Sequence, residues 1–123
     1  MSTRFSSAVR LRRRSEFDLV QREGRRVATR HLILLGRPNG LDRDRLGIIA
    51  SRRFGHAVAR ARAKRRLREL FRRHEPDGAL ARGVTPMDLV AIPKRELNAA
   101  PFPVVVREFD SALEKLRGSG RTP

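Results

Sequence analysis

Hydrophobic residues occur along the chain in short runs, and their spacing changes from one run to the next. Ser15 stands before a segment with acids in its first turn, a pattern that predicts a short helix capped by this serine and ended by Gly24. Three later apolar runs, at 29–35, 45–51 and 87–92, are too short for helices and predict β-strands. The short connection between the first two strands favours their antiparallel pairing.

Two longer segments have helical periodicity. When residues 58–74 are placed on a helix, four apolar side chains fall within a sector of about 100°, the width of a stripe that faces a core. They are Ala63, Leu67, Leu70 and Phe71. A second helix, which Pro103 can start, has one apolar face made by Val105, Val106, Phe109, Ala112, Leu113 and Leu116. The order helix, strands, helix, strand, helix predicts an α+β or small α/β sandwich with helices packed on one sheet.

The length of 123 residues suits a single hydrophobic core and is too short for two. We assign residues 11–117 to one domain. Residues 1–10 lack a sustained period and are predicted to form a flexible basic tail, and residues 118–123 a flexible polar tail.

Charge changes this picture more than any other property of the composition. Lysine and arginine number 29 against 13 acids, for a net charge of +16, and 26 of the cations are arginine. Such a charge repels itself in a compact fold and calls for a polyanion, with nucleic acid the first candidate. Arginine also meets phosphate with two hydrogen bonds, although high genomic GC content enriches arginine as well. The absence of cysteine fits a reducing cytoplasm, and no apolar run is long enough to span a membrane.

The charge is concentrated on the predicted helix at 58–74. Arg60, Lys64, Arg68 and Arg72 follow one flank at a spacing of four, and Glu69 is the only acid of the segment. Like charges at this spacing, and cations in the first turns, each destabilise a helix by a few tenths of a kcal/mol to about 1 kcal/mol. A solvated cationic helix face is the plain alternative, but such faces usually mix the two signs. We therefore interpret this flank as a surface for phosphates.

The histidines and acids of the sequence do not form the pattern of a catalytic site. His31, His56 and His74 lack metal-ligand spacing, so we expect them to be surface residues or RNA contacts. Asp18 and Asp88 are isolated acids in different elements, whereas a metal-dependent nuclease needs clustered acids or histidines. We expect no metal site in the protein.

Two stretches of the chain match a known family. The run RLGIIASRRFGHAVARARAKRRLRE (45–69) resembles the signature of the bacterial ribonuclease P protein subunit. LRRRSEFDLV (11–20), with Gly24 and Arg25, resembles the first helix of that family and the turn after it. The resemblance covers the chain from about Leu11 to Leu116.

The resemblance implies an αβββαβα sandwich with a mixed sheet and a left-handed crossover through the arginine-rich helix. It also implies a protein subunit that helps to remove the 5′ leader of precursor tRNA, while the RNA subunit performs the hydrolysis with Mg²⁺. The implied partners are ribonuclease P RNA and precursor tRNA, with no membrane and no further protein required. The implied contacts with the catalytic RNA are Arg52, Arg53, Arg60, Arg62, Lys64, Arg65 and Arg68. The implied leader-binding cleft contains Phe17, Arg25, Arg30 and Leu35.

Two positions depart from the family pattern. The central asparagine of the family's Arg-Asn-Arg motif is Ala61 here, and a second aromatic residue of the first helix is Gln21. Phe17 would then carry more of any stacking with leader bases. The residues alone favour a core role for Phe17, and the resemblance brings the stacking role level with it. A general RNA or DNA binder and an independent metal-dependent nuclease are the competing hypotheses.

Overall fold

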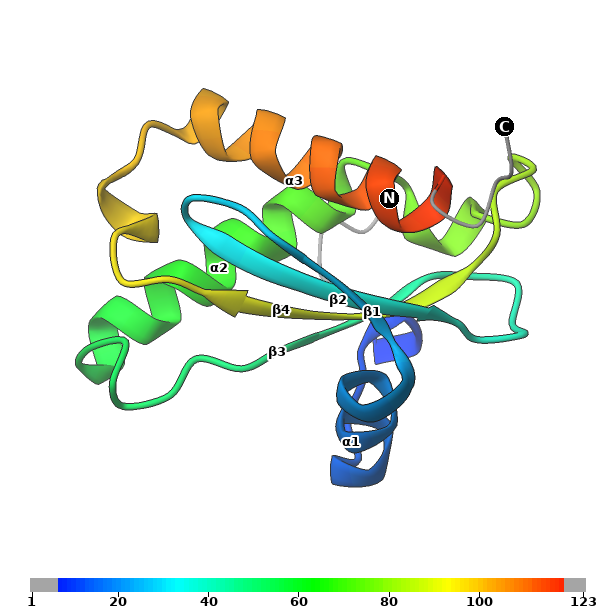
Figure 1. Cartoon of the computed structure of the whole chain (residues 1–123), viewed down its shortest axis with the longest axis horizontal. Coiled ribbons are helices and arrows are strands. Elements are labelled where there is room, and N and C mark those ends of the chain that lie inside the picture. Colours follow the sequence, from blue (N-terminus) through cyan, green and yellow to red (C-terminus); the bar gives the residue numbers. More distant parts are fainter. Residues whose placement is uncertain (1–6, 119–123) are drawn as a thin grey trace.

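The computed structural model describes residues 7–118, which form three α-helices and one four-stranded sheet (Figure 1). In chain order these are α1 (Arg14–Glu23), β1 (Arg25–Ala28), β2 (Leu32–Pro38), β3 (Arg45–Ile48), α2 (Ala57–Arg72), β4 (Met87–Pro93) and α3 (Phe102–Gly118). Short 3-10 helical turns lie at Ser7–Val9, Pro76–Gly78 and Leu97–Ala99. The order confirms the predicted α+β fold class with a mixed sheet, and the left-handed sense of the crossover stays a prediction.

The sheet has the strand order β1-β2-β4-β3. β1 pairs with β2 and β2 with β4 in antiparallel fashion, whereas β3 and β4 run parallel. The predicted direct pairing of residues 29–35 with 45–51 is therefore wrong, because β4 lies between them. β4 is buried along nearly its whole length, and a strand buried in this way is most stable in the centre of a sheet with both faces covered. The parallel pair β3 and β4 needs a long crossover connection, which α2 provides.

The sheet separates two hydrophobic cores of unequal size. α2 and α3 lie on one side of it and α1 on the other (Figure 1). The larger core, under α2 and α3, includes Leu34, Leu46, Leu67, Phe71 and Phe109. The smaller core, under α1, consists of Leu11, Val20, Leu35 and Val90, with Phe17, Ile33, Ile49 and Ile92 half-buried around it. Because α1 has only 10 residues, it leaves part of its face of the sheet uncovered.

The apolar stripes predicted for the two longer helices are confirmed. Ala63, Leu67, Leu70 and Phe71 are the buried residues of α2. The buried residues of α3 are Val105, Phe109, Ala112, Leu113 and Leu116, while Val106 is half-buried. Pro103 lies in the first turn of α3, which begins at Phe102.

The start of α1 differs from the prediction and its end agrees with it. The helix begins at Arg14, so Ser15 lies inside the first turn and does not cap it. Instead, Glu16 Oε1 accepts hydrogen bonds from the backbone N–H groups of Arg12 and Arg13, each at 3.0 Å. Gly24 follows the last residue of the helix as predicted. A Cβ at this position would lie 2.4 Å from the Val20 carbonyl oxygen, so the turn into β1 requires glycine.

Part of the predicted N-terminal tail belongs to the fold. Val9 is buried in the larger core, and Arg10 forms a parallel β-bridge with Leu46 of β3. The remainder of that tail, residues 1–6, and residues 119–123 of the predicted C-terminal tail lie outside the described residues.

Two histidines join α3 to the rest of the molecule. His31 Nδ1 contacts Glu108 Oε2, and Glu108 Oε1 accepts hydrogen bonds from the hydroxyl of Thr29 at 2.7 Å and from the His31 backbone at 2.9 Å. His74 Nε2 lies 2.8 Å from Asp110 Oδ1. His31 and His74 are half-buried and each faces a carboxylate of α3, so neither is a plain surface residue as expected. Contact of either histidine with RNA stays a prediction. His56 alone of the three is exposed, immediately before α2.

Candidate nucleic-acid interface

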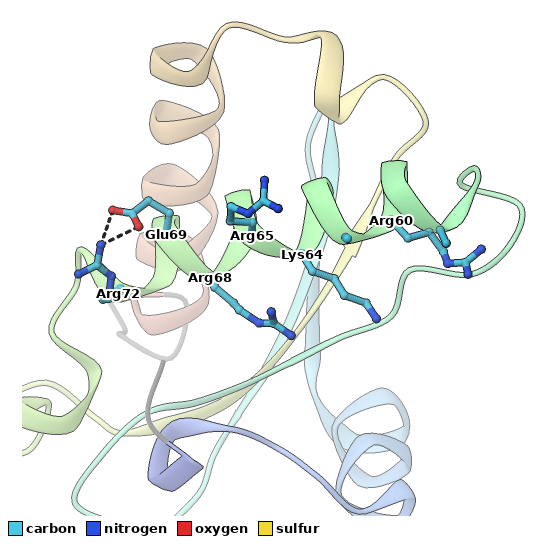
Figure 2. Close-up of a pocket in the computed structure, with 8 residues that line it drawn as sticks. Arg60, Lys64, Arg65, Arg68, Glu69 and Arg72 are labelled. Carbon is cyan, nitrogen blue, oxygen red and sulfur yellow. Dashed lines mark hydrogen bonds and ion pairs between the residues drawn. The ribbon is translucent and has the colours of Figure 1, made fainter. Parts of the chain in front are cut away.

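The outward flank of α2 forms a shallow groove walled by cations. Its cavity of about 450 Å³ is lined by Ala57, Arg60, Ala61, Lys64, Arg65, Arg68, Glu69 and Arg72. Figure 2 shows Lys64 and Arg68 extending from one side of the helix toward β3, whereas Arg65 extends from the other side. The helical spacing of four therefore aligns cations along one path, as the sequence predicted.

Several of these cations are held by local contacts. Arg72 Nη2 donates to both carboxylate oxygens of Glu69 at 2.7 and 2.8 Å (Figure 2). Arg60 Nη1 donates to the Gly55 carbonyl oxygen at 3.0 Å, which ties the first turn of α2 to the loop before it. These contacts orient the side chains and leave donors free to meet a phosphate, because a guanidinium carries five N–H groups.

Arg66 has a different role from its neighbours on α2. Its Nη1 donates to the Leu97 carbonyl oxygen at 2.7 Å, and its guanidinium lies 5.6 Å from the centroid of the Phe102 ring. Arg66 therefore fastens α2 to the segment before α3. Helical spacing alone predicts an outward position for Arg66, together with Arg62, Arg65 and Arg73.

The remaining residues predicted to contact the catalytic RNA lie outside the groove lining but on the same end of the molecule. Arg52 and Arg53 are exposed in the turn between β3 and α2, and Arg62 is exposed on α2 itself. Only Arg60, Lys64, Arg65 and Arg68 of the predicted set share the groove.

A small cavity of about 120 Å³ connects α2 with the opposite side of the sheet. Arg10, Lys64 and Arg68 line it together with Phe17 and the last three residues of β3. Burial lowers the pKa of Arg68, and the positive charge of Arg10 lowers it further. The sequence analysis missed Arg10 because it assigned this residue to the tail, and only its position beside the apolar Leu11 could have suggested otherwise.

The face of the sheet under α1 carries a second, more open groove of about 380 Å³. Arg12, Arg14, Phe17, Asp18, Gln21 and Ile49 line it. Phe17 is half-buried and leans on β3, where a Cβ added to Gly47 would lie 2.4 Å from Phe17 Cε1. The groove therefore presents an aromatic ring between arginines. Arg12 and Arg14 were not predicted as site residues. Cations near the N-terminus of a helix are unfavourable in α1 as they are in α2, so the argument used for α2 could also have indicated these two residues.

The other residues predicted for the leader-binding cleft are dispersed by the fold. Leu35 shares the face of Phe17 but is 6% exposed in the smaller core. Arg25 pairs with Gly36 and lines a different cavity with Met87 and Leu116, on the α3 side of the sheet. Arg26, the next residue, pairs with Leu35 and so lies on the α1 side. Arg30 is exposed in the turn between β1 and β2.

The acids near this groove are engaged in structural contacts. Asp88 is not isolated, because Arg45 donates to both of its carboxylate oxygens at 2.8 and 2.7 Å. Among residues 7–118, no group of three or more histidine, cysteine, aspartate or glutamate side chains is arranged to hold a metal ion. Within the same residues, no helix has the length and hydropathy needed to cross a membrane.

A helix with a cationic flank and a basic groove that contains an aromatic ring are both typical of proteins that bind nucleic acid. Comparison with known proteins gives the family. A family model described as Ribonuclease P matches residues 5–117. The chain therefore belongs to the ribonuclease P protein family, whose members are protein components of a tRNA-processing enzyme.

Individual relatives agree with this assignment. The ribonuclease P protein component of Thermotoga maritima is 40% identical over 98 residues, which are 80% of each chain. That of Syntrophus aciditrophicus is 32% identical over 106 residues, 86% of this chain and 85% of the relative. The solved structure of the Thermotoga maritima protein superposes with a TM-score of 0.74 at 35% identity, covering 89% of this chain and 98% of that one. The Staphylococcus aureus protein shares the fold, with a TM-score of 0.75 at 24% identity over 90% of this chain and 99% of that one.

Proposed function

We propose that this protein is the RNA-binding subunit of ribonuclease P and that it has two binding surfaces. The cationic flank of α2, with Arg52 and Arg53 before it, binds the catalytic RNA. The groove under α1 binds the single-stranded 5′ leader of precursor tRNA, and the RNA subunit cleaves the leader from the tRNA. The observation that carries the proposal is that these two basic grooves lie on opposite sides of one sheet and are joined by the cavity of Arg10, Lys64 and Arg68.

The α2 surface is suited to the sugar-phosphate backbone of a folded RNA. Its cations repel one another in the free protein, and phosphates reverse the sign of each of these interactions. The floor of the groove is made by Ala57 and Ala61, which have no side-chain group that can form hydrogen bonds with base edges. Recognition there rests on phosphate and sugar contacts and on the shape of the RNA.

The α1 surface is suited to a single strand. Phe17 offers a face for base stacking, worth roughly 1 to 3 kcal/mol per base, and Arg12 and Arg14 lie beside it for the phosphates. Gln21 lines the same groove, at the position where the family pattern has a second aromatic residue. We therefore assign the stacking in this groove to Phe17 and a hydrogen-bonding role to Gln21.

Hydrolysis is assigned to the RNA subunit. Mg²⁺ bound to that RNA would generate the attacking hydroxide and stabilise the leaving oxygen. Asp18 lines the groove as an exposed side chain 3.9 Å from Arg14, and the nearby carboxylates of Glu16 and Asp88 are occupied by Arg45 and by backbone N–H groups. The protein contributes binding and orientation, and neither a further protein nor a membrane is needed. The absence of cysteine suits a reducing compartment, so we place the protein in the cytoplasm.

Reconstitution tests this proposal. Purified protein is added to the catalytic RNA at a Mg²⁺ concentration too low for the RNA alone, and the 5′ end of the cleaved precursor tRNA is mapped. We expect the protein to restore cleavage at the mature 5′ end. A general RNA or DNA binder would bind duplexes equally well and leave cleavage unchanged, and a protein nuclease would cleave without any RNA subunit. Either result would contradict the proposal.

A further inference from the structure

Arg45, at the start of β3, connects three elements that meet below the sheet. Its Nε and Nη2 donate to the two carboxylate oxygens of Asp88 in β4 at 2.8 and 2.7 Å. Its Nη1 donates to Glu16 Oε2 in α1 at 3.1 Å. One planar guanidinium therefore bridges two strands and the helix above the leader groove, a geometry that lysine cannot reproduce.

Asp88 and Glu16, the two partners of Arg45, are held by further hydrogen bonds. The Asp88 side chain is 6% exposed, and its Oδ1 also accepts a hydrogen bond from Asn39 Nδ2 at 3.0 Å. The remaining oxygen of Glu16, Oε1, accepts the backbone N–H groups of Arg12 and Arg13. These hydrogen bonds, followed by the nearby charge of Arg45, lower the pKa of Glu16 against the effect of burial. The contact with Arg45 thus sets the direction in which the chain enters α1.

Few other contacts hold α1 in place. Val20 is its only buried residue, and Phe17 packs against Gly47, two residues after Arg45. An isolated helix of ten residues is marginal in water, so its position depends on these few attachments. The groove residues Arg12, Arg14 and Phe17 all lie within four residues of Glu16, through which Arg45 holds α1. A shift of Glu16 would move all three relative to β3.

We propose that Arg45 is a positioning residue for leader recognition: through Glu16 it sets the distance between α1 and the sheet at which a single strand fits the groove. This inference rests on the leader-binding role proposed above. Three of the five N–H donors of Arg45 are engaged within the protein, and its side chain is 22% exposed. Arg45 acts through α1 and not as a phosphate contact.

The test uses the holoenzyme assembled from full-length protein and catalytic RNA. Arg45→Lys keeps the positive charge but cannot form the three hydrogen bonds of the guanidinium. Glu16→Gln keeps the shape of the side chain but removes the negative charge that pairs with Arg45. We measure the Kd for precursor tRNA and for mature tRNA. For the wild-type protein we expect tighter binding of the precursor, and for each variant a loss of that preference by about tenfold, or about 1.4 kcal/mol. The double variant should lose little more than either single variant, because both remove one contact.

Glu108→Gln is the matched control. Glu108 is also a part-buried carboxylate with a lowered pKa, but it joins α3 to the opposite face of the sheet. It should lower the Tm without changing the preference for precursor tRNA. An equal loss of preference in Glu108→Gln would mean that general destabilisation explains the result, and an unchanged preference in Arg45→Lys and Glu16→Gln would overturn the inference. A wild-type holoenzyme without preference for the precursor would contradict the leader-binding role itself.

A distance measurement supplies a readout that is independent of RNA affinity. The chain has no cysteine, so spin labels can be placed on cysteines introduced at the exposed positions Arg22 in α1 and Glu96 after β4. We expect one narrow distance distribution in the otherwise unchanged holoenzyme and a broader or shifted one in the presence of Arg45→Lys. Identical distributions would show that α1 keeps its place without Arg45 and would overturn the inference.

Discussion

Gly47 decides where the ring of Phe17 can lie. The ring occupies the space that a β-carbon on Gly47 would fill, since the added atom would be 2.4 Å from Phe17 Cε1 and 2.5 Å from Cζ. Neither ring atom can move away without turning the whole side chain on α1. The absence of a methyl group at Gly47 therefore lets the ring lie at the edge of the groove lined by Arg12 and Arg14.

Gly47→Ala should weaken precursor tRNA binding by the holoenzyme about tenfold while leaving mature tRNA binding unchanged. The displaced ring would lose a stacking contact worth roughly 1 to 3 kcal/mol. Titration of both tRNAs measures the effect. Phe17→Ala should give a similar loss, and the double variant little more, because both changes act on the same ring.

Gly78→Ala serves as the control for Gly47→Ala. A Cβ at Gly78 would meet its nearest neighbour, Arg82 Nη1, at an ordinary 3.5 Å, and this residue lies away from both grooves. Equal effects of the two alanine substitutions would contradict the role given to Gly47.

At the level of single residues, the sequence indicates which side chains lie together only where neighbours in space are also near in sequence. Phe17 stands beside arginines in the chain and lies beside them in the groove. Arg25 was expected in the same groove, but its strand register puts it on the other face, and Arg26 on the face of Phe17. Side chains alternate along a strand, so an error of one position reverses the face. The register becomes known only once the partner strand is known.

At the level of elements, α3 depends on polar contacts as well as on its apolar stripe. Burial by itself would raise the pKa of Glu108, but hydrogen bonds from Thr29 and His31 lower it to a net value below the ordinary one. A carboxylate with a lowered pKa stabilises the folded protein above its unfolded-state pKa, and the contribution is lost as the pH falls through the folded-state pKa.

Glu108→Gln should therefore lower the free energy of unfolding by roughly 1 to 2 kcal/mol at neutral pH. The difference from wild type should shrink as the pH falls below about 4.3, the ordinary pKa of glutamate, because the wild-type carboxyl then also becomes neutral. Urea unfolding at several pH values measures both quantities. A difference that is constant across this range would show that the charge of Glu108 contributes nothing.

The helices could be predicted from the sequence more fully than the sheet. A stripe such as Ala63, Leu67, Leu70 and Phe71 repeats within the segment itself, so periodicity alone defines it. The order of strands depends on contacts between distant segments. Residues 29–35 and 45–51 are neighbours in the chain, yet β4 lies between them because its apolar residues need cover on both faces.

For the whole molecule, the net charge of +16 is the dominant property. The cations do not form one uniform surface. Those of α2 line one groove, and those around α1 line another. A third set, which includes Arg45 and Arg66, serves the fold itself. The total charge predicts a polyanionic partner, but only the structure shows which cations line the grooves and which are engaged within the fold.

Salt dependence distinguishes these sets. Arg60→Ala and Arg65→Ala should each weaken assembly with the catalytic RNA and reduce the slope of log K against log salt by about one, because each removes a phosphate contact. Arg107→Ala removes the same charge from an exposed position on α3 and should leave the slope nearly unchanged. Equal slopes for all three variants would mean that the protein binds through its overall field and not through the α2 groove.

The central position of β4 has a consequence for synthesis of the protein. β1 and β2 can pair as soon as both have left the ribosome, but β3 has no neighbour in the sheet until Met87–Pro93 has been translated. α2 is translated before β4, so the sheet on which α2 packs is incomplete until β4 has been made. A nascent chain arrested before residue 87 would therefore expose the apolar stripe of its arginine-rich helix, the strand β3 without its partner and the open edge of β2, which makes it a substrate for chaperones and proteases.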